Sequence, residues 1–286
     1  MRTPHRILVT GGCGFIGSAF VRHLLNRQDF SGHIVNLDKL TYAGNPASVV
    51  GHVPESRHTL VQGDICDRAL VLRLLDEHQI DTLIHFAAES HVDRSIEGPS
   101  PFVISNVVGT MELLEAVRQR PQVHLHHIST DEVFGSLGEE GFFTEETPYQ
   151  PSSPYSASKA ASDHLVRAWG HTFELSYTLS NCSNNYGPFQ FPEKLIPLMI
   201  LNLLEGKPLP VYGQGTNVRD WLFVDDHVEA IWAIVTRGAK GRTYNVGGRA
   251  ERRNLDVVHA LIGIVARLTG KSETALRQSI QYVKDR

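Results

Sequence analysis

A glycine-rich turn between a short strand and a helix, close to the N-terminus, most constrains the fold of this chain. Residues 6–10 (RILVT) are mainly apolar and partly β-branched, and Gly11, Gly14 and Gly17 follow them. From residue 18 to 27 the apolar side chains recur with the period of a helix. A strand that passes through a glycine turn into a helix is the context of a dinucleotide-binding motif. This stretch therefore predicts the first unit of an α/β sheet.

The three glycines have separate roles in such a motif. Gly11 permits the tight turn, Gly14 lets the backbone approach a pyrophosphate, and Gly17 lets the helix pack close to the strand. The N–H groups and the dipole at the start of the helix then favour negatively charged phosphates. The alternative interpretation is a flexible glycine loop that binds no ligand.

Acidic residues follow the next two predicted strands. The apolar segment 34–37 ends at Asp38, and the segment 59–64 ends at Asp64, which we expect to meet the adenine. A carboxylate at Asp38 can accept hydrogen bonds from ribose hydroxyls and would repel a 2′-phosphate, so the sequence favours NAD over NADP. The adjacent Lys39 weakens this preference because it adds a positive charge.

Strands and helices continue to alternate along the chain. We expect helices at 69–78, around 106–119 and from about 155 to 169, and further strands at 81–88, 123–128 and 176–183. This alternation predicts an α/β fold with a doubly wound parallel Rossmann sheet in a domain of residues 1–183. A returning segment at about 220–248, with a helix from Asp225 and a strand at 242–248, should rejoin that domain.

The remaining residues, 184–219 and 249–286, should form a smaller mixed α/β domain that binds the substrate. In it we expect a helix that ends at Leu204, a short edge segment at 207–212, a polar loop at 213–221 and a helix at 254–268. Arg219 in the polar loop could pair with a diphosphate in bidentate fashion, or could simply pair locally with Asp220.

Composition excludes several classes of protein. The chain has 286 residues and a net charge of −4, so it has no overall positive charge that would favour nucleic acid as a partner. Its three cysteines, Cys13, Cys66 and Cys182, are far apart and odd in number, as expected of a reduced cytoplasmic protein. No signal peptide and no run long enough to span a membrane is recognisable, so we expect a cytoplasmic protein without a membrane partner.

The stretch Ser129–Gly135 (STDEVFG) carries the strongest candidates for acid–base chemistry. It follows the predicted strand at 123–128, and ligands of open α/β sheets bind beyond the carboxyl ends of the strands. Asp131 and Glu132 are placed there to share acid and base work on one substrate. The alternative is that both residues only cap and solvate a loop.

Tyr155 and Lys159 form a second candidate pair. They are four residues apart at the start of a predicted helix and therefore share a face. A nearby ammonium group and a positively charged nicotinamide would both lower the pKa of the phenol towards the range of a useful base. In isolation, a surface Tyr and Lys on an amphipathic helix would be the more ordinary interpretation.

Two further patterns are interpreted as structural. His124, His126 and His127 could suggest a metal site, but a strand sends the last two to opposite faces, so we expect no metal. Cys182 lies near the active-site end of a predicted strand without an adjacent base, so we expect it to be structural.

Together these motifs resemble the extended short-chain dehydrogenase/reductase family and, within it, the dTDP-glucose 4,6-dehydratases. The resemblance covers essentially the whole chain. Its motifs are AAESHVDRS at 87–95, TDEVFG at 130–135, YSASK at 155–159, NNYGP at 184–188, FPEK at 191–194 and NVRDW at 217–221. The acid pair Asp131–Glu132 discriminates these enzymes from the related sugar epimerases, which lack it.

The resemblance implies a lyase that removes water from a sugar nucleotide with the help of NAD. Tyr155, assisted by Lys159, would take the proton of the C4 hydroxyl, and Thr130 would hydrogen-bond the C4 oxygen. Glu132 would then remove the C5 proton as an ionised base, and Asp131 would protonate the departing C6 hydroxyl as an acid. The product would be a 4-keto-6-deoxy sugar nucleotide, and thymidine is expected as its base only by resemblance.

The resemblance also implies binding residues. The sugar nucleotide would contact Ser90, Thr130, Asn184, Lys194, Leu195, Pro210, Val211, Tyr212, Arg219 and Asn254. NAD would contact Gly11, Gly14, Phe15, Ile16, Gly17, Asp38, Lys39, Leu40, Thr41, Asp64, Ile65, Phe86, Ala87, Ala88, Glu89, Ser90, Ser105, Tyr155, Lys159 and Asn185.

Some alternatives stay open at this stage. The same scaffold could serve another 4,6-dehydratase, a 4-epimerase or a decarboxylase of sugar nucleotides, or a non-catalytic NAD-binding protein. The family implies a homodimer formed through helices around 106–119 and 155–169. Its members continue beyond Arg286 with a Pro-Gly-His-Asp motif, so we expect a substrate domain truncated at the C-terminus, with exposed apolar surface and poor solubility.

Overall fold

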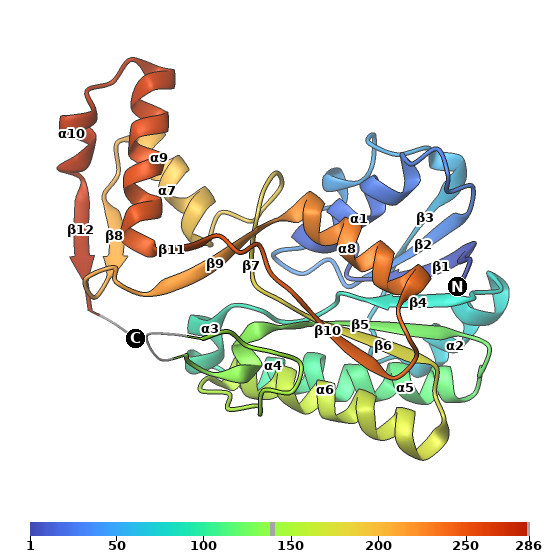
Figure 1. Ribbon diagram of the computed structural model, residues 1–286. Coiled ribbons are helices and arrows are strands. Elements are labelled where there is room, and N and C mark those ends of the chain that lie inside the picture. Colours follow the sequence, from blue (N-terminus) through green and yellow to red (C-terminus); the bar gives the residue numbers. More distant parts are fainter. Residues whose placement is uncertain (138–140, 285–286) are drawn as a thin grey trace. The chain divides into compact units, whose positions relative to one another are not determined.

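A parallel sheet of seven strands forms the centre of the first of two units in the computed structural model, which describes residues 1–137 and 141–284. This unit contains Met1–Cys182 and Val224–Val246. The strands lie in the order β10-β6-β5-β4-β1-β2-β3, and each neighbouring pair is parallel (Figure 1). Their bounds are β1 (Arg6–Thr10), β2 (His33–Asp38), β3 (His58–Gln62), β4 (Thr82–His85), β5 (His124–Thr130), β6 (Tyr177–Cys182) and β10 (Arg242–Val246). The predicted doubly wound Rossmann sheet is confirmed.

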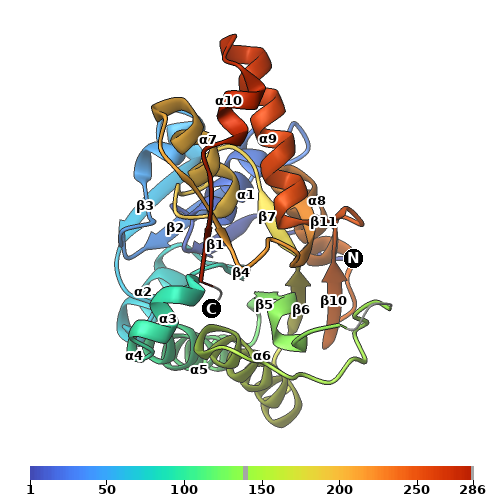
Figure 2. The ribbon, with the colours of Figure 1, turned by 90° about the vertical axis from the view of Figure 1, so that its left-hand side faces the viewer.

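Helices cover both faces of this sheet (Figure 1). On one face α1 (Phe15–Leu25) and α8 (Val224–Arg237) bury side chains such as Phe20 and Ile231 against β1 and β2. On the other face α2 (Arg68–Glu77), α5 (Thr110–Arg118) and α6 (Pro154–Phe173) bury Leu74, Leu113 and Val166. Figures 1 and 2 both show α5 and α6 side by side on this second face. The sheet is therefore apolar on both sides, as parallel sheets are.

The predicted strand at 81–88 is too long at its carboxyl end. β4 stops at His85, which is in register with Thr10, the last residue of β1. The Phe86 N–H still donates to the Thr10 carbonyl at 3.0 Å, but the glycine turn then leaves the sheet. Residues 86–88 therefore form a loop because their neighbouring strand has ended.

The predicted helix around residues 106–119 begins with an irregular segment. The short helix α4 (Ser100–Phe102) passes into a π-helix (Val103–Gly109), and α5 follows directly. The wide turn leaves Asn106 almost completely buried. π-helical turns are often found at functional sites, and this one supports the loop after β4, as described below.

Short elements connect the main ones in this unit. They are the 3₁₀ turns Pro46–Ser48, Glu55–Arg57 and Asp131–Phe134, and the helix α3 (Val92–Glu97). α6 begins at a capping box, in which the Ser153 hydroxyl accepts from the Ser156 N–H and the Ser156 hydroxyl accepts from the Ser153 N–H, both at 3.0 Å. Pro154 occupies the first turn, which suits its missing N–H. The sequence thus fixes the start of α6.

The second unit contains Ser183–Phe223 and Gly247–Arg286. It has a three-stranded sheet of β7 (Asn184–Tyr186), β9 (Val218–Phe223) and β11 (Glu251–Arg253), and a parallel pair of β8 (Leu209–Tyr212) and β12 (Ile280–Val283). Its helices are α7 (Leu195–Glu205), α9 (Asn254–Thr269) and α10 (Glu273–Arg277). Met199, Leu203, Val258 and Ile262 form its core together with β8.

The prediction of a polar loop over 213–221 was wrong for its second half. Residues 218–221 belong to β9, which pairs with β7 on one side and β11 on the other. The sequence did not indicate this strand, because Arg219 and Asp220 interrupt its apolar residues and extend the polar stretch that precedes it. Its Asp220 carboxylate accepts from the N–H groups of Gly248 and Ala250, both at 2.7 Å, so partners distant in the chain stabilise it.

None of the helices within residues 1–137 and 141–284 combines the length and the apolar character that crossing a bilayer requires.

We expect two neighbouring leucines of α7 to differ sharply in their contribution to stability. Leu203 is buried in the core of the second unit, whereas Leu204 is half-exposed. Leu203→Ala should lower the free energy of unfolding by about 2–5 kcal/mol, because it removes buried methyl groups and leaves a cavity. Leu204→Ala, the matched control, should change it by less than about 0.5 kcal/mol. Denaturant unfolding measures both, and equal losses would contradict the assigned core.

Candidate active site

The glycine turn after β1 is packed too closely to hold side chains. Gly11 has φ of +72°, and a Cβ there would lie 2.6 Å from the Ala87 nitrogen. A Cβ at Gly17 would lie 2.2 Å from the Gly11 carbonyl oxygen. Gly14, which has no side chain, caps α1, and none of the described residues in the first turn of α1 is acidic. The helix thus presents bare backbone to an anion, a fit for the pyrophosphate of NAD.

Asp38 is held at the end of β2 by backbone groups. Its carboxylate accepts from the Cys13 and Leu40 N–H groups, both at 2.8 Å, and it is nearly buried. Lys39, which weakened the preference for NAD in the sequence, forms an ion pair at 2.7 Å with Asp64 instead. Burial disfavours ionisation of Asp64, but the Cys66 N–H and Lys39 outweigh it and lower its pKa. The Asp38 carboxylate therefore suits ribose hydroxyls.

The loop after β4 is fixed by Asn106 from the π-helix. The Asn106 amide accepts from the Glu89 N–H and donates to the Glu89 carbonyl, both at 2.9 Å. It also donates to the Ser158 hydroxyl on α6 at 2.8 Å. Asn106 thus joins the loop that carries the expected NAD contacts Phe86–Ser90 to the helix that carries Tyr155. Nothing in the sequence alone indicates this role of Asn106, because in a regular α-helix its side chain would point in a different direction.

Thr130, Asp131 and Glu132 lie where β5 ends and a 3₁₀ turn begins. The Thr130 hydroxyl accepts from the Glu132 N–H at 3.3 Å and faces Asp131 Oδ1 at 3.4 Å. Its side chain also interacts with that of Tyr155, where it opposes the rise of the Tyr155 pKa. Gly135 ends the turn at φ of +87°, and a Cβ there would lie 2.6 Å from the Gln150 carbonyl oxygen. The structure thus brings the hydroxyl of Thr130 and the phenol of Tyr155 together beside two carboxyls.

Tyr155 and Lys159 lie on the buried face of α6. Both side chains are at least nine-tenths buried, and Lys159 Nζ donates to the Ile128 carbonyl of β5 at 2.9 Å. Burial is the main cause that raises the pKa of Tyr155 well above its usual range, and the charge of Glu132 adds to it. The predicted lowering of this pKa is therefore not a property of the chain alone. It requires positive charge from a bound cofactor.

A buried polar cluster behind Lys159 was not predicted from the sequence. It consists of His127 and Ser129 on β5, Asp163 on α6, Tyr149 and Asn181. The three histidines of β5 do divide between faces: His126 contacts Thr178, while His127 contacts Asp163. The available sequence signal was the position of Asp163, four residues after Lys159 on the same helical face.

Cys182 lies at the end of β6, where its buried thiol contacts the Ser129 carbonyl at 3.3 Å. Within residues 1–137 and 141–284, no three His, Cys, Asp or Glu side chains are grouped so as to hold a metal ion.

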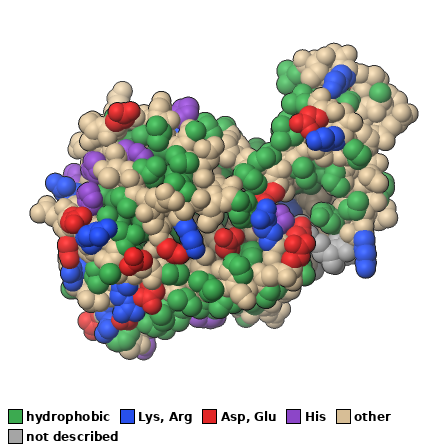
Figure 3. Space-filling view, turned by 180° about the vertical axis from the view of Figure 1, so that it is seen from behind, with side chains coloured by type: hydrophobic (Ala, Val, Ile, Leu, Met, Phe, Trp, Pro, Cys, Tyr) green, Lys and Arg blue, Asp and Glu red, His purple; other side chains and the backbone are tan. Residues whose placement is uncertain are grey.

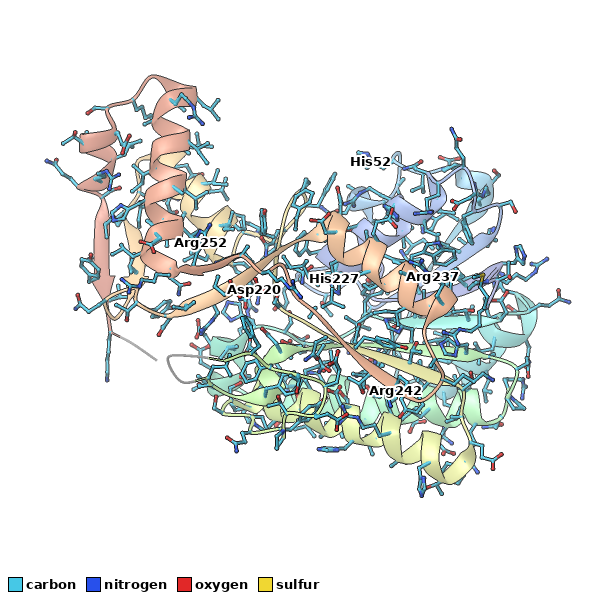
Figure 4. All side chains as sticks on the ribbon, in the orientation of Figure 1. His52, Asp220, His227, Arg237, Arg242 and Arg252 are labelled. Carbon is cyan, nitrogen blue, oxygen red and sulfur yellow. The ribbon has the colours of Figure 1, made fainter. Side chains whose placement is uncertain are left out.

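The other expected substrate contacts belong to the second unit. Asn184 and Asn185 lie on β7, Lys194 and Leu195 at the start of α7, Pro210–Tyr212 on β8, Arg219 on β9 and Asn254 at the start of α9. Figure 4 shows Asp220 on β9 and Arg252 on the adjacent β11. Arg252 is in register with Arg219, so two cationic side chains oppose each other. Like charges in that position repel unless an anion lies between them.

Comparisons with known proteins agree with these motifs. The family model for GDP-mannose 4,6 dehydratase matches residues 8–286. The dTDP-glucose 4,6-dehydratase of Xanthomonas campestris pv. campestris (strain B100) is 56% identical over 98% of this chain and 82% of its own. That of Escherichia coli (strain K12), dTDP-glucose 4,6-dehydratase 1, is 52% identical with the same coverage. The crystal structure of dTDP-glucose 4,6-dehydratase from Bacillus anthracis str. Ames in complex with NAD has a TM-score of 0.89 and 45% identity, over 99% of this chain and 85% of that chain.

We expect Gly17→Ala to weaken NAD binding while leaving the protein folded. The added Cβ would collide with the Gly11 backbone and open the turn that approaches the pyrophosphate. Isothermal titration with NAD should show an affinity at least about tenfold weaker, which corresponds to about 1.4 kcal/mol. Gly98→Ala is the control, since a Cβ there meets no atom within 4 Å among the described residues. Equal NAD affinity of both variants would contradict the assigned site.

Proposed function

The chain belongs to the nucleotide-sugar 4,6-dehydratase family, within the extended short-chain dehydrogenases/reductases, and from this membership we propose which of its residues perform the reaction. The protein is an NAD-dependent lyase that dehydrates dTDP-glucose to dTDP-4-keto-6-deoxy-glucose. The observation that best supports the residue roles is the placement of Asp131 and Glu132 directly after Thr130, whose hydroxyl accepts from the Glu132 N–H at 3.3 Å and faces the Asp131 carboxyl at 3.4 Å.

The chemistry that NAD would supply when bound is reversible storage of the sugar's hydride, taken from C4 and given back at C6, together with a positively charged ring. Gly11, Gly14 and Gly17 would hold its pyrophosphate, because their turn leaves backbone N–H groups at the start of α1. Asp38 would accept hydrogen bonds from the adenosine ribose hydroxyls. The other NAD contacts that we propose lie in the loops after β2, β3 and β4, in the π-helix and on β7. They are Lys39–Thr41, Asp64, Ile65, Phe86–Ser90, Ser105 and Asn185.

Tyr155 serves as the base for the C4 hydroxyl in this mechanism. Its interaction with the Thr130 side chain favours ionisation of the phenol. The Lys159 ammonium, held to the Ile128 carbonyl, contributes positive charge from behind and favours the phenolate. With the hydroxyl proton on Tyr155 and the C4 hydride on the bound cofactor, C4 would be a ketone and the C5 hydrogen would be acidic.

Glu132 and Asp131 then divide the elimination of water between them. Glu132 removes the C5 proton as general base, and Asp131 gives its proton to the departing C6 hydroxyl as general acid. The two adjacent carboxyls must therefore be in opposite protonation states when the keto sugar is bound. The Thr130 hydroxyl accepts from the Glu132 N–H and donates to the Asp131 carboxyl. These two contacts fix the turn that presents the acid pair.

The second unit would bind the rest of the sugar nucleotide. Arg219 and Arg252 face each other across β9 and β11, which suits a diphosphate with two negative charges. Lys194 and Asn254 stand at the starts of α7 and α9, where backbone N–H groups favour anions. Ser90, Asn184, Leu195 and Pro210–Tyr212 would complete the contacts.

The activity is tested with purified protein, NAD and dTDP-, UDP- and GDP-glucose in parallel, with products resolved by mass. We expect a product lighter by one water, without net NADH, from dTDP-glucose. A C4 epimer without loss of water would support a 4-epimerase instead. Bound NAD without any product would support a non-catalytic protein.

We expect Glu132→Gln to slow dehydration by about 10²–10⁴-fold, because an amide cannot accept the C5 proton. Oxidation at C4 should still occur, so the absorbance of NADH should rise and persist after dTDP-glucose is added. Glu97→Gln, on the exposed side of α3, is the control and should behave like the unmodified protein. Full dehydration activity of Glu132→Gln would exclude Glu132 as the base.

We further propose a cytoplasmic homodimer. Free cysteines, two of them buried, suit a reducing compartment. The π-helix and α3 leave Val103, Ile104, Val108 and Ile96 exposed next to α5 and α6. Figure 3 shows hydrophobic side chains among charged ones over the lower part of one face of the molecule. Such apolar side chains on neighbouring helices suit contact with a second copy of the chain.

Ile104→Arg should convert the dimer to a monomer, because burying an unpaired guanidinium at an apolar interface is costly. Light scattering after size-exclusion chromatography measures the mass. Ile264→Arg on α9 is the control, since Ile264 is similarly exposed but lies in the second unit. A monomeric unmodified protein, or a dimer unaffected by Ile104→Arg, would contradict the assigned interface.

A further inference from the structure

Helix α6 carries a row of four functional side chains at intervals of four residues. Tyr155, Lys159, Asp163 and Arg167 succeed one another along the face that packs on β5. The first three are at least nine-tenths buried, and Arg167 is partly buried. The row therefore alternates a phenol, a cation, an anion and a second cation within one enclosed layer. Only the first two have a role in the mechanism above.

Asp163 is the anion at the centre of this layer. Oδ2 accepts from the hydroxyls of Ser129 at 2.7 Å and Tyr149 at 2.9 Å, and from the Asn181 amide at 3.3 Å. Oδ1 lies 3.1 Å from Nε2 of His127. Burial opposes ionisation, but His127, Lys159 and Ser129 outweigh it and lower the pKa of Asp163. Asp163 is therefore a carboxylate.

Lys159 depends on a counter-charge because it is also buried. Its Nζ donates to the Ile128 carbonyl and lies 3.5 Å from His127 Nε2. Burial lowers the pKa of Lys159, whereas the charge of Asp163 opposes that change. His127 cannot supply a counter-charge, because an imidazole is either neutral or positively charged, and burial and Lys159 keep it neutral by lowering its pKa to about 4. Cys182 is the other group that favours the ammonium, but only as a thiolate.

The remaining side chains hold Asp163 in place. Arg167 donates to the Tyr149 hydroxyl at 2.7 Å and stacks on its ring, with 4.7 Å from the guanidinium carbon to the ring centre. Tyr149 in turn donates to Asp163. These contacts hold the Asp163 carboxylate one helical turn from Lys159. None of them transfers a proton to it, so it keeps its negative charge.

We propose that Asp163 is a positioning residue that keeps Lys159 in its ammonium form and thereby sets the upper pH limit of proton transfer by Tyr155. This inference rests on the proposed roles of Tyr155 and Lys159. Without the carboxylate, the buried amine releases its proton at lower pH, and Tyr155 loses the positive charge behind it. A merely structural Asp163 would affect the stability of the fold but not the protonation of Lys159.

The test is Asp163→Asn, an uncharged side chain of nearly the same shape. The protein is labelled with [ε-¹³C]lysine, and the Lys159 resonance is identified by its loss in Lys159→Met. In the unmodified protein this resonance should stay at its ammonium position to at least about pH 9. In Asp163→Asn its midpoint should fall by about one pH unit or more. This measurement needs no turnover, so it remains informative even if the proposed reaction fails.

The pH profile of dehydration gives the second measurement. In Asp163→Asn the alkaline limb of the profile should move to lower pH by the same interval as the Lys159 midpoint. At pH values above the alkaline limits of both proteins, turnover of the variant should be about tenfold lower than that of the unmodified protein. At about pH 6.5 the two should be close. Ser129→Ala is the matched control, because it removes one hydrogen bond from the same carboxylate and keeps the charge. Its Lys159 midpoint and alkaline limb should not move.

Three results would overturn the proposal. They are an unshifted Lys159 midpoint in folded Asp163→Asn, an equal shift in Ser129→Ala, and a Lys159 midpoint below about pH 8 in the unmodified protein. If Asp163→Asn does not fold, Asp163→Glu replaces it. A folded Asp163→Glu that keeps the alkaline limb supports the proposal, and one that loses it overturns it. The midpoint in the unmodified protein is measured in every case.

Discussion

The close approach of the first glycine turn to the backbone after β4 is the constraint on which the first unit depends. β1 and β4 are adjacent at the point where the strand order reverses, and Thr10 is in register with His85. A Cβ at Gly11 would overlap the backbone of Ala87, so this contact exists only because residue 11 is glycine. Ligands of doubly wound sheets bind in the crevice at such a reversal. The close approach of Gly11 to Ala87 thus also shapes the crevice in which the cofactor is expected to bind.

A second constraint comes from burying charge in the helix layer. Lys159 and Asp163 lie on adjacent turns of α6, and each makes the burial of the other tolerable. An ammonium or a carboxylate alone in that layer would lose its charge. Because α6 packs on β5, this pair is enclosed between the helix and the strand that ends at Thr130. The acid pair that we propose to act on the sugar is then placed by a short 3₁₀ turn.

The main features of the site could be predicted because they follow from local patterns. Gly11, Gly14 and Gly17 are spaced within one turn, and Tyr155 and Lys159 within one turn of a helix. The residues that were missed act through contacts between distant segments. Asn106 reaches Glu89 only because of a π-helical turn, and Asp163 reaches Ser129 across the helix–sheet interface. β9 was missed for the same reason, since its partners β7 and β11 are distant in sequence.

The sequence by itself indicated the alternation of strands and helices in the first unit, the NAD-binding turn and the side chains that we propose to react. Periodicity and residue type carry that information within a few turns of chain. Only the tertiary structure decided the charge states around those side chains. The nearby ammonium group of Lys159 leads one to expect a lowered pKa for Tyr155. The pKa is raised instead, because burial of the phenol and the charge of Glu132 both oppose its ionisation. Desolvation depends on everything that surrounds a group, and no local pattern records it.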